Sequence, residues 1–409
     1  MKFTFSKNNQ ISQDESQIET FLSRGVENIF PNKEDVKKKL LSGKKLKVYL
    51  GIDPTGPTLH IGHAIPLRKM KELQNMGHEI ILLIGDFTAM IGDPTDKSSA
   101  RKQLTREEVL NNCKYYKKQA GKIISFAGVN PAKFVFNSKW LKKMNFSDVL
   151  NLASRVTVDQ MLKRDMFEKR MSEGKPLFIH ELMYPLMQGY DSVAMNVDGE
   201  IGGNDQTFNM LMGRELSSEL NHKEKFVMTT KLLADSSGKK MGKTEGNMIT
   251  LEDSPSNMFG KVMSWTDEMI IPGFELCTDV SLGEIEKNKK DLENGVNPRD
   301  IKIKLAKEIV NTFCGKPFGE EAERDFINTF SKKGVPENIE EVKVLKFEKM
   351  ADVLLKAGTV ESKGEWRRLV LQGGVSNAET DEKITSPDEV VKNITLKVGK
   401  RRFIRLAVE

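Results

Sequence analysis

The sequence predicts an α/β protein built on a doubly wound parallel sheet. The first observation is the order strand, helix, strand over residues 48–86, which is the pattern of a βαβ unit with a right-handed crossover. The second is the run EIILLIGD at 79–86, whose continuous hydrophobicity is typical of a strand covered on both faces. The third is the further alternation of apolar runs and helical patterns up to residue 195, which favours helices on both faces of one sheet.

Each predicted element follows from a local signal. Residues 1–47 are charged and fit a helical pattern. The apolar run VYLGI at 48–52 ends in DPTGPT, where proline and glycine stop regular structure. A helical pattern covers about 60–76, and Gly77 suits the position just after a helix end. The remaining predicted elements of this half are a charged helix over 105–120, a strand over 133–137, and helices over 140–170 and 178–195.

The pattern changes after residue 250. Residues 255–330 predict a mainly helical region, and residues 331–340 are typical of a linker. The tail, 345–409, begins with the helical patterns MADVLLKAG and SKGEWRRLVLQGG and ends with the β-like runs NITLKV and RFIRLAV. The second half is therefore expected to hold a helical region followed by a small α+β module.

Composition limits the function classes. The chain has 409 residues, enough for two to four domains at about 100–200 residues each. Hydrophobic residues are 38% and charged residues 30%, and no run of about 18 apolar residues occurs, so no membrane span is expected. The polar N-terminus lacks the features of a signal or transit peptide. Three scattered cysteines without a CxxC disfavour a disulfide framework or a cysteine zinc site and fit a reducing cytoplasm, and the net charge of +6 favours polyanions mildly.

Two of the five histidines fall within four residues of each other, in the segment DPTGPTLHIGH at 53–63. His60 and His63 are spaced i, i+3 at the start of a predicted helix, after a strand end where open α/β sheets bind ligands. A helix N-terminus attracts phosphate, and Gly62 leaves room for close approach. The pair could donate hydrogen bonds to a transferring phosphoryl group. The alternatives are a capping or packed histidine pair, or two metal ligands, although HxxH alone makes a poor zinc site.

A glycine-hinged basic loop is predicted at ADSSGKKMGKTEGNMI, residues 234–249. Lys240 and Lys243 lie on either side of Gly242, and Thr244 follows. The loop is not a Walker A motif, because position 237, where that motif needs glycine, is a serine. A mobile lysine loop can close over phosphates and stabilise developing charge. The alternative is a solvated surface loop, the usual fate of a lysine cluster.

A polar stripe is predicted on the otherwise apolar helix at 180–195. Tyr184, Gln188 and Asp191 fall at i, i+4 and i+7 and therefore share one face. If that face is buried, its hydroxyl, amide and carboxylate need partners, which a pocket for a small polar molecule would supply. The alternative is an ordinary amphipathic helix with its polar side in water.

The segment GEIGGNDQTFN at 199–209 favours the pocket. It places Asp205 and Gln206 at what is expected to be another strand end. Carboxylate and amide groups at that position could hold a ribose or an ammonium group.

A further loop is predicted in IGDFTAMIGDPTDKSSARK, residues 84–102. Asp93 sits in a Gly-Asp-Pro turn. Lys97 and Arg101 follow in a serine-rich stretch suited to a mobile basic loop. The alternative is a plain surface loop.

Taken together, these segments resemble one family. HIGH at 60–63 and KMGKT at 240–244 resemble the two signature motifs of class I aminoacyl-tRNA synthetases, in the right order and in a Rossmann-type context. The words YLGIDPT, IGDPT, YPLMQGYD and GGNDQ are similar to tyrosyl-tRNA synthetases, and IGDFTAMIGDPT and NDQTFNMLMGREL to their second bacterial subtype. The similarity covers most of residues 45–250 and extends to the tail.

The resemblance implies which residues bind ATP. The positions that match the catalytic phosphate site of the family are His60, His63, Thr55, Lys240, Lys243 and Thr244. ATP contacts are also implied for Asp53, Gly62 and Asp205. Leu50 departs from the pattern, because related enzymes can carry a polar residue there that touches the ribose.

The resemblance also implies a tyrosine pocket. Asp191 and Tyr49 match the positions that hold the phenol of the substrate. Tyr184, Gln188 and Asp93 match positions near its ammonium group, and Gln206 matches a position at its carboxylate end. A phenylalanine would leave Asp191 and Tyr49 without a partner, a discrimination for which this enzyme class is itself the standard example.

The implied activity is that of a tyrosine–tRNA ligase. The tyrosine carboxylate attacks the α-phosphate of ATP, which enters with Mg²⁺, and the tyrosyl group then passes to tRNA(Tyr). The implied partners are L-tyrosine, ATP, tRNA(Tyr) and a second copy of the chain, with no protein-bound metal and no membrane. The alternatives are the tryptophan-specific sister enzyme, a nucleotidyltransferase with the same HxGH chemistry, and a non-catalytic RNA-binding paralogue.

The tail resembles a small RNA-binding module first known from a ribosomal protein. The basic residues expected to face RNA are Lys363, Arg367, Arg368, Lys400, Arg401 and Arg402. The alternative is a solvated charged helix beside a basic edge strand. The domains are then expected as a Rossmann-type catalytic domain at 1–235, the lysine loop with a helical anticodon-side domain at 236–335, and the RNA-binding module at 345–409.

Overall fold

A computed structural model describes residues 11–94, 103–162, 165–234, 248–331, 339–380, 382–399 and 402–408. The chain divides into two compact units. Unit 1 comprises Met1–Asp253 and Trp265–Pro298, and unit 2 comprises Ser254–Ser264 and Arg299–Glu409. None of the helices that the structure describes has the length and apolar character of a membrane-spanning segment.

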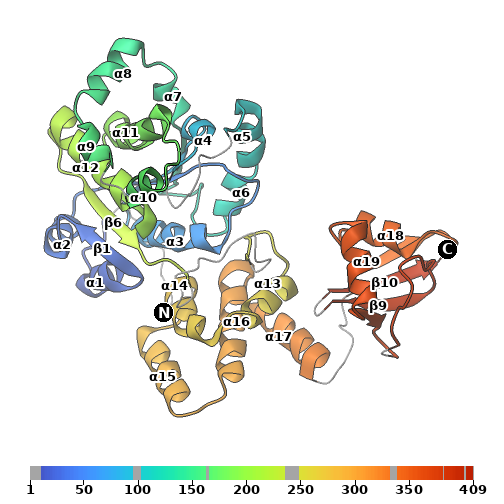
Figure 1. The fold of residues 1–409 in the computed structure, drawn as a ribbon. Coiled ribbons are helices and arrows are strands. Elements are labelled where there is room, and N and C mark those ends of the chain that lie inside the picture. The colour runs from blue at the N-terminus through green and yellow to red at the C-terminus, as the bar shows by residue number, and fades with distance from the viewer. Residues whose placement is uncertain are drawn as a thin grey trace. The chain divides into compact units, whose positions relative to one another are not determined.

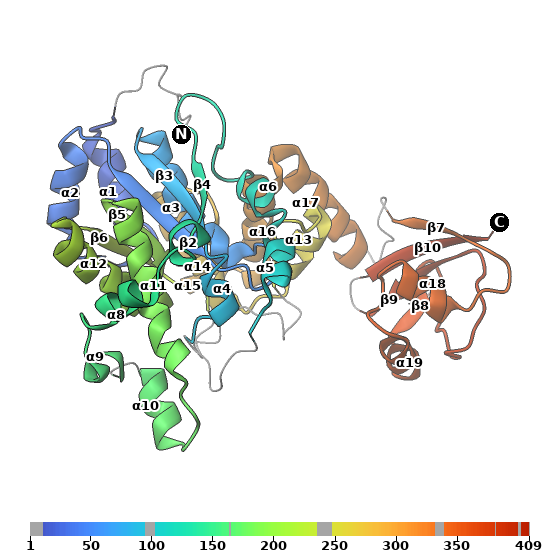
Figure 2. The ribbon, with the colours of Figure 1, turned by 90° about the horizontal axis from the view of Figure 1, so that it is seen from above.

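Unit 1 is built on a six-stranded sheet with the strand order β1-β6-β5-β2-β3-β4. The strands are β1 (Val26–Phe30), β2 (Lys47–Ile52), β3 (Glu79–Ile84), β4 (Lys133–Phe136), β5 (Gly199–Gly203) and β6 (Phe226–Thr230). All neighbouring strands run parallel except the edge strand β1, which is antiparallel to β6. Figure 2 shows β2, β3 and β4 near one another. The predicted doubly wound parallel sheet is confirmed, and its order reverses between β2 and β5.

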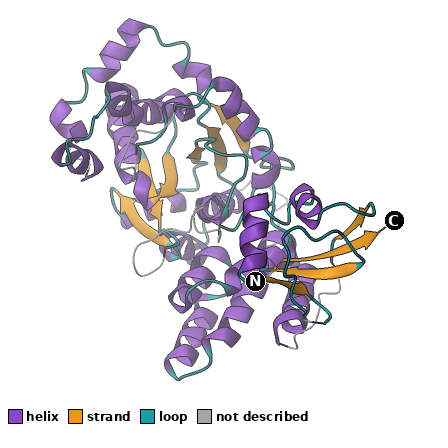
Figure 3. Ribbon diagram, turned by 45° about the vertical axis from the view of Figure 1, so that its right-hand side comes forward, coloured by secondary structure: helices purple, strands orange, loops and turns teal. Residues whose placement is uncertain are grey.

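The helices of unit 1 lie around this sheet or extend away from it (Figure 3). They are α1 (Glu15–Ser23), α2 (Lys33–Leu41), α3 (Ile61–Asn75), α4 (Thr88–Ile91), α5 (Arg106–Cys113), α6 (Tyr116–Ala120), α7 (Ser138–Leu141), α8 (Phe146–Ala153), α9 (Val158–Leu162), α10 (Asp165–Ser172), α11 (Ile179–Met195), α12 (Thr207–Asn221), α14 (Ile270–Cys277) and α15 (Leu282–Glu293). Helix α3 packs on β2, β3 and β5, whereas α12 packs on β5 and β6 and against α11. In Figure 1, α11 and α12 are labelled above β6, and α3 lies to the right of it.

The βαβ unit forms for the reasons that the sequence suggests. Strand β3 is buried from Ile80 to Ile84, as expected of a strand covered on both faces. Helix α3 ends at Asn75, and Gly77 adopts a φ of 93°, a left-handed conformation that glycine adopts without strain. The chain can therefore turn sharply from α3 into β3.

Several predicted boundaries were wrong. Residues 1–47 were expected to be helical, but β1 interrupts them, because an edge strand that is partly exposed gains its pairing from the distant β6. The predicted helix over 105–120 is two helices, α5 and α6, and the predicted helix over 140–170 is four short ones. Asn145 starts one of these by capping α8 in a reciprocal capping box with Asp148.

Unit 2 contains helices and a second sheet. Its helices are α13 (Pro255–Met263), α16 (Pro298–Cys314), α17 (Lys316–Ser331), α18 (Met350–Lys356) and α19 (Lys363–Leu371). The sheet has the order β7-β10-β9-β8, from β7 (Glu341–Val344), β8 (Val375–Asn377), β9 (Ile394–Val398) and β10 (Arg402–Val408). The helical region and the α+β module were predicted, but β7 and β8 were not. Most of the predicted linker, residues 332–338, lies outside the described residues.

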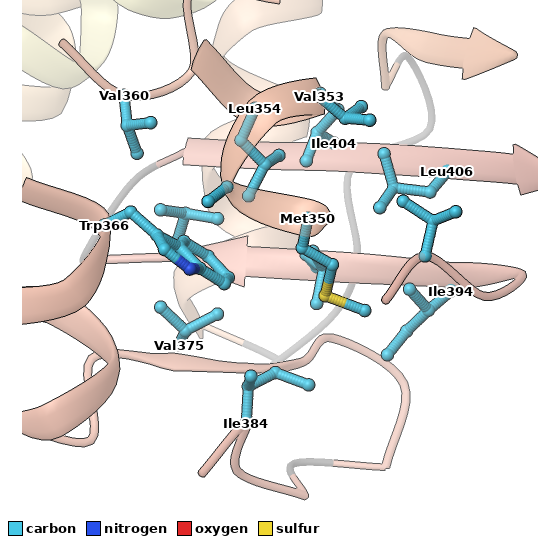
Figure 4. Close-up of a cluster of buried hydrophobic side chains, with 14 of the residues drawn as sticks. Met350, Val353, Leu354, Val360, Trp366, Val375, Ile384, Ile394, Ile404 and Leu406 are labelled. Carbon is cyan, nitrogen blue, oxygen red and sulfur yellow. The ribbon is translucent and has the colours of Figure 1, made fainter. Parts of the chain in front are cut away.

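The α+β module has its own hydrophobic core (Figure 4). Side chains from α18, such as Met350 and Leu354, converge with those of the strands, such as Ile404 and Leu406. Trp366 of α19 is almost fully buried in this core, and its indole N–H donates to the Pro387 carbonyl at 2.8 Å. The core explains why the tail folds as a packed module.

Candidate active site

The point where the strand order reverses gathers the predicted motifs of unit 1. The segment 53–63 follows β2, and residues 204–206 follow β5 as a 3₁₀ turn, η1 (Asn204–Gln206). β2 and β5 are neighbouring parallel strands, so their carboxyl ends meet at one sheet edge. Ligands of open α/β sheets bind in this crevice.

The two histidines of the HIGH motif form the N-terminus of α3. His60 is the N-cap: its Nδ1 accepts from the Gly62 N–H at 3.1 Å, and His63 Nδ1 accepts from the His60 N–H at 3.2 Å. Because each Nδ1 accepts, each neutral ring carries its proton on Nε2 and donates from that atom. The capping alternative is thus realised, and it orients the donors at a helix N-terminus that favours anions.

Glycine leaves room for the His60 ring between the histidines. A Cβ on Gly62 would lie 3.0 Å from two atoms of the His60 ring. The two imidazole rings themselves are only 3.9 Å apart between centroids. A side chain at Gly62 would therefore push the capping ring by a few tenths of an ångström.

The segment that follows the lysine loop pairs with the histidine segment. The Ile61 N–H donates to the Ile249 carbonyl at 2.9 Å, and the Leu251 N–H donates to the Leu59 carbonyl at 2.9 Å. His60 and Thr250 form an antiparallel bridge between these bonds. One end of the lysine loop is thereby held beside the histidines. Lys240, Lys243 and Thr244 themselves lie outside the described residues, as do Lys97 and Arg101.

Three side chains from α5 and α6 hold the DPTGPT loop. Asn112 donates to the Pro54 carbonyl at 3.0 Å, and Tyr116 donates to the Gly56 carbonyl at 2.6 Å. Buried Gln119 accepts from the Leu59 N–H at 2.7 Å. Sequence reasoning missed these residues, since a charged helix offers no local sign that its polar side chains face a loop about 60 residues earlier.

Thr55 is exposed on this loop. Its backbone N–H donates to the Asp53 carbonyl at 2.8 Å, which tightens the turn after β2. Because loop atoms on both sides of it are held from α5 and α6, Thr55 is positioned by backbone contacts. Leu50, the residue that departs from the family pattern, is buried in β2.

Asp53 lies among hydroxyl donors. Tyr184 of α11 donates to Asp53 Oδ2 at 2.9 Å, and Thr88 of α4 donates to Asp53 Oδ1 at 2.7 Å. A Cβ on Gly85 would lie 1.9 Å from Asp53 Oδ1, so only glycine fits there. Burial and the Asp53 carboxylate raise the pKa of Tyr184 well above its ordinary value, and its hydroxyl stays protonated. The structure thus joins two predicted residues, Asp53 and Tyr184.

Asp191 is a buried carboxylate with N–H donors. The Trp140 indole donates to Asp191 Oδ1 at 2.7 Å, and the Asn137 amide donates to Asp191 Oδ2 at 3.3 Å. Burial raises the pKa of Asp191 well above its ordinary value, while both hydrogen bonds favour the charged form. The polar stripe of α11 therefore faces the interior at Tyr184 and Asp191, and the amphipathic alternative with those groups in water was wrong.

Tyr49 and Gln188 contact a cluster of three buried polar side chains. These are Ser192 of α11, Glu200 of β5 and Lys225, just before β6. The Tyr49 hydroxyl is 2.9 Å from Ser192 Oγ, and burial raises the pKa of Tyr49 well above its ordinary value. Gln188 donates to Glu200 Oε1 at 3.2 Å. Tyr49 also packs in a small apolar cluster with Trp140, on the side of the sheet that faces Asp191. Ser192, Glu200 and Trp140 were not predicted.

Asp93 and Gln206 are also brought together. Gln206 Nε2 donates to Asp93 Oδ2 at 2.7 Å, and Asn209 of α12 donates to Gln206 Oε1 at 3.0 Å. The turn after α4 is thus linked to the end of β5. Asp205, the neighbour of Gln206 in η1, is partly exposed at the same edge.

This arrangement suits a small zwitterion beside a phosphate chain. Buried carboxylates and hydroxyls line α11 and the ends of β2 and β5, and imidazole donors lie at the start of α3. Such preorganised groups position reactants and stabilise charge without a protein nucleophile. Within the part of the chain that the structure describes, no group of three or more histidine, cysteine or acidic residues could hold a metal ion.

The basic residues of the tail differ in their contacts. Arg367 and Arg368 are exposed on α19, whereas Lys363 is paired with Asp352. Arg402 donates to Glu365 at 2.7 Å. Lys400 and Arg401 lie outside the described residues.

Comparison with known proteins identifies the family. The sequence profile of the class I tRNA synthetases (W and Y) matches residues 41–331, which is more than half of the chain. The chain belongs to this family. The resemblance drawn from its motifs is confirmed, and so is the Rossmann-type fold class.

Relatives within this synthetase family match nearly the full length. A tyrosine–tRNA ligase of Carboxydothermus hydrogenoformans is 46% identical over 403 residues, covering 95% of this chain and 97% of the relative. A tyrosine–tRNA ligase 2 of Pseudoalteromonas translucida is 44% identical, covering 95% and 98%. A C-terminally truncated mitochondrial tyrosyl-tRNA synthetase of Aspergillus nidulans has the same fold, with a TM-score of 0.65 and 22% identity over 77% of this chain and 94% of that one.

Proposed function

We propose that this protein is a tyrosine–tRNA ligase, which activates L-tyrosine with ATP and transfers the tyrosyl group to the 3′ end of tRNA(Tyr). The observation that carries the proposal is the match to tyrosine–tRNA ligases over 95% of the chain at 44–46% identity. The site agrees with it, because a buried carboxylate, Asp191, lies on the same side of the sheet as the Tyr49 hydroxyl. A pocket built to pair a phenolic hydroxyl rejects a side chain that lacks it.

In the proposed pocket each end of tyrosine meets its own groups. Asp191 accepts a hydrogen bond from the phenolic hydroxyl, and Tyr49 lies beside the phenolic oxygen. Tyr184, Gln188 and Asp93 surround the ammonium group. Gln206 and Asp205 lie toward the carboxylate and the ribose. The hydrogen bonds from Trp140 and Asn137 support this assignment, since they hold the Asp191 carboxylate before substrate arrives.

In the proposed first step, the tyrosine carboxylate attacks the α-phosphate in line and pyrophosphate leaves. ATP enters as its Mg²⁺ complex, and the ion is part of the substrate. Asp53 and Gly62 border the nucleotide, while Thr55, His60 and His63 stabilise its phosphates. Lys240, Lys243 and Thr244 close over the phosphates from the loop, one end of which is paired with the histidine segment. Lys97 and Arg101 are proposed to form a second basic loop.

We propose a homodimer in the cytoplasm. Large apolar side chains are exposed along residues 146–179, including Phe146 at 76% and Ile179 at 78% exposure. An apolar surface of this kind is typical of a protein–protein interface. Phe146→Glu should lower the dimer fraction in sedimentation velocity. The matched control is Val129→Glu, since Val129 is also exposed, at 67%, but lies outside that stretch.

The proposed division is a catalytic domain at 1–235, a lysine loop with an anticodon-side helical domain at 236–335 and an RNA-binding module at 345–409. Exposed Arg367 and Arg368 suit phosphate contacts. Changing both to alanine should raise the KM for tRNA and flatten its salt dependence. Tyrosine-dependent exchange should stay unchanged, and a parallel loss there would contradict a role confined to RNA.

The test of the function is amino-acid-dependent ATP–pyrophosphate exchange with tyrosine, phenylalanine and tryptophan in parallel. Exchange with tyrosine alone, followed by charging of tRNA(Tyr), is the expected result. Exchange with tryptophan would reassign the protein to the sister specificity. A folded protein with no exchange would refute the ligase and leave a non-catalytic RNA-binding role.

A further inference from the structure

A buried ion pair lies behind the tyrosine pocket, and the proposed reaction makes no use of it. Lys225, just before β6, contacts Glu200 of β5, and their side chains are 0% and 3% exposed. Taking both charges out of water costs more than their attraction returns unless hydrogen bonds satisfy them. A buried ion pair is therefore weak evidence for added stability, and a role in positioning other groups would account for its presence.

Each charged group of the pair contacts a polar residue that belongs to the proposed tyrosine pocket or adjoins it. Lys225 Nζ donates to Ser192 Oγ at 2.8 Å, and Ser192 Oγ is 2.9 Å from the Tyr49 hydroxyl. Glu200 Oε1 accepts from Gln188 at 3.2 Å. The pair therefore contacts Gln188 directly. It reaches the Tyr49 hydroxyl through Ser192, and the Lys225 ammonium group also lies over the Tyr49 ring, 5.6 Å from its centroid.

The fold leaves space for the contact between Lys225 and Ser192. A Cβ on Gly213 of α12 would lie 2.7 Å from both Lys225 Nζ and Ser192 Oγ. Gly189 of α11 faces Gly213 at the same level, so that the two helices approach closely. The ammonium group occupies a gap that only these small residues provide.

The charges decide which way the hydroxyl protons point. An ammonium group can only donate, so Ser192 Oγ accepts from Lys225. A hydroxyl that accepts from a cation becomes a stronger donor, and the group it reaches is the Tyr49 oxygen. The Tyr49 proton then needs an acceptor other than Ser192: Glu200 is such a group in the free protein, and the phenolic oxygen of bound tyrosine would be the other. At the far side of the pocket both oxygens of Asp191 already accept N–H bonds, from Trp140 and Asn137, which favours the charged form that acts as an acceptor.

We propose that Lys225 and Ser192 are positioning residues that turn the Tyr49 hydroxyl into a donor toward the phenolic oxygen of tyrosine. The inference rests on the proposed function. With tyrosine bound, the hydrogen bonds run in one direction, from Lys225 through Ser192 and Tyr49 to the substrate phenol and on to Asp191. Phenylalanine cannot complete this chain, so Lys225 and Ser192 contribute to its rejection.

Ser192→Ala tests the relay because it leaves both charges of the ion pair in place. In tyrosine-dependent pyrophosphate exchange, the KM for tyrosine should rise about 3- to 10-fold, the value of one hydrogen bond. The inhibition constant of phenylalanine should not change, because phenylalanine makes no use of the relay. The matched control is Ser217→Ala on α12, since the Ser217 hydroxyl is buried and has no hydrogen-bond partner among the described residues. A shift of both constants would indicate a general loss of packing and overturn the proposal.

A double-mutant cycle tests whether Ser192 acts through Tyr49. Tyr49→Phe alone should raise the KM for tyrosine, and adding Ser192→Ala should raise it no further. Effects that multiply in the double variant would overturn the proposal. The pair Lys225→Met with Glu200→Gln removes both charges together, which buried pairs tolerate better than one change, and the amide oxygen can still accept from Gln188. This double variant should also raise the KM for tyrosine without changing the inhibition constant of phenylalanine. An unchanged KM would show that Lys225 does not act on Tyr49.

Different results would refute the proposed function and the role of Lys225 and Ser192. An unmodified protein without tyrosine-dependent exchange overturns the proposed function and this inference with it. Normal exchange together with an unchanged KM for tyrosine in Ser192→Ala overturns the inference alone.

Discussion

The stability of unit 1 should depend on pH through one buried histidine. His78 follows the turn after α3 and has 0% exposure. Its Nδ1 accepts from the Leu46 N–H at 3.2 Å, just before β2. Its Nε2 is buried without a hydrogen-bond partner among the described residues. Protonation would thus break the bond to Leu46 and bury a charge, and burial lowers the pKa of His78 to about 4.

The size of the effect follows from linkage between protonation and folding. The ordinary pKa of histidine is 6.5 and the folded value is about 4, so the unfolded chain takes up the proton first as pH falls. His78 therefore costs no stability well above pH 6.5 and an increasing amount below it. The loss is about 2 kcal/mol at pH 5 and about 3 kcal/mol at pH 4.

The measurement compares the protein with His78→Asn, whose amide oxygen can still accept a hydrogen bond near the Nδ1 position but does not titrate. Urea unfolding is followed by tryptophan fluorescence between pH 7.5 and 4. The chain has three tryptophans, and a Trp366→Phe background leaves only Trp140 and Trp265, both in unit 1. The difference in unfolding free energy between the two proteins then isolates His78 from the carboxylates that titrate in both.

Between pH 7.5 and pH 4, the unfolding free energy of the asparagine variant is expected to rise by about 3 kcal/mol relative to that of the unmodified protein. Equal pH dependence of the two proteins would refute the reasoning. It would mean that His78 is protonated in the folded protein as easily as in the unfolded chain.

Two further predictions concern the loops of the site. Gln119→Ala removes the acceptor of the buried Leu59 N–H, so it should lower the free energy of unfolding by about 1–3 kcal/mol and raise the KM for ATP. Unchanged exchange kinetics would show that the loop keeps its position without Gln119. Gly85→Ala places a Cβ 1.9 Å from Asp53 Oδ1 and should lower tyrosine-dependent exchange at least about tenfold. The control is Gly283→Ala, since nothing lies within 4 Å of that added Cβ, and equal activity of both variants would contradict the steric reasoning.

The sequence predicted best those features that depend on neighbouring residues. Continuous hydrophobicity identified β3, and Gly77 marked the end of α3, because helix and strand periods and glycine conformations are local properties. The chain order of strands and helices placed the HIGH motif after one strand end and Asp205 after another, and the parallel pairing of β2 with β5 brings those ends to one sheet edge.

The supporting contacts of the site could not be predicted in this way. Gln119 holds Leu59 across 60 residues, and Trp140 reaches Asp191 across 51. No spacing rule joins residues so far apart, since their contact arises only when separate helices pack on the same sheet. The edge strand β1 was missed for the same reason, because its pairing partner, β6, lies about 200 residues later.

The sequence by itself therefore determined the family and the fold class, and it supplied the residues that are proposed to meet the substrates, since these depend on short motifs and periodic patterns. Only the tertiary structure decided how those residues are held. It turned His60 into a helix cap, gave Asp191 its indole donor, and placed the charge of Lys225 behind Tyr49. These are hydrogen bonds between distant segments in a water-poor interior, where the orientation of each group depends on the packing around it.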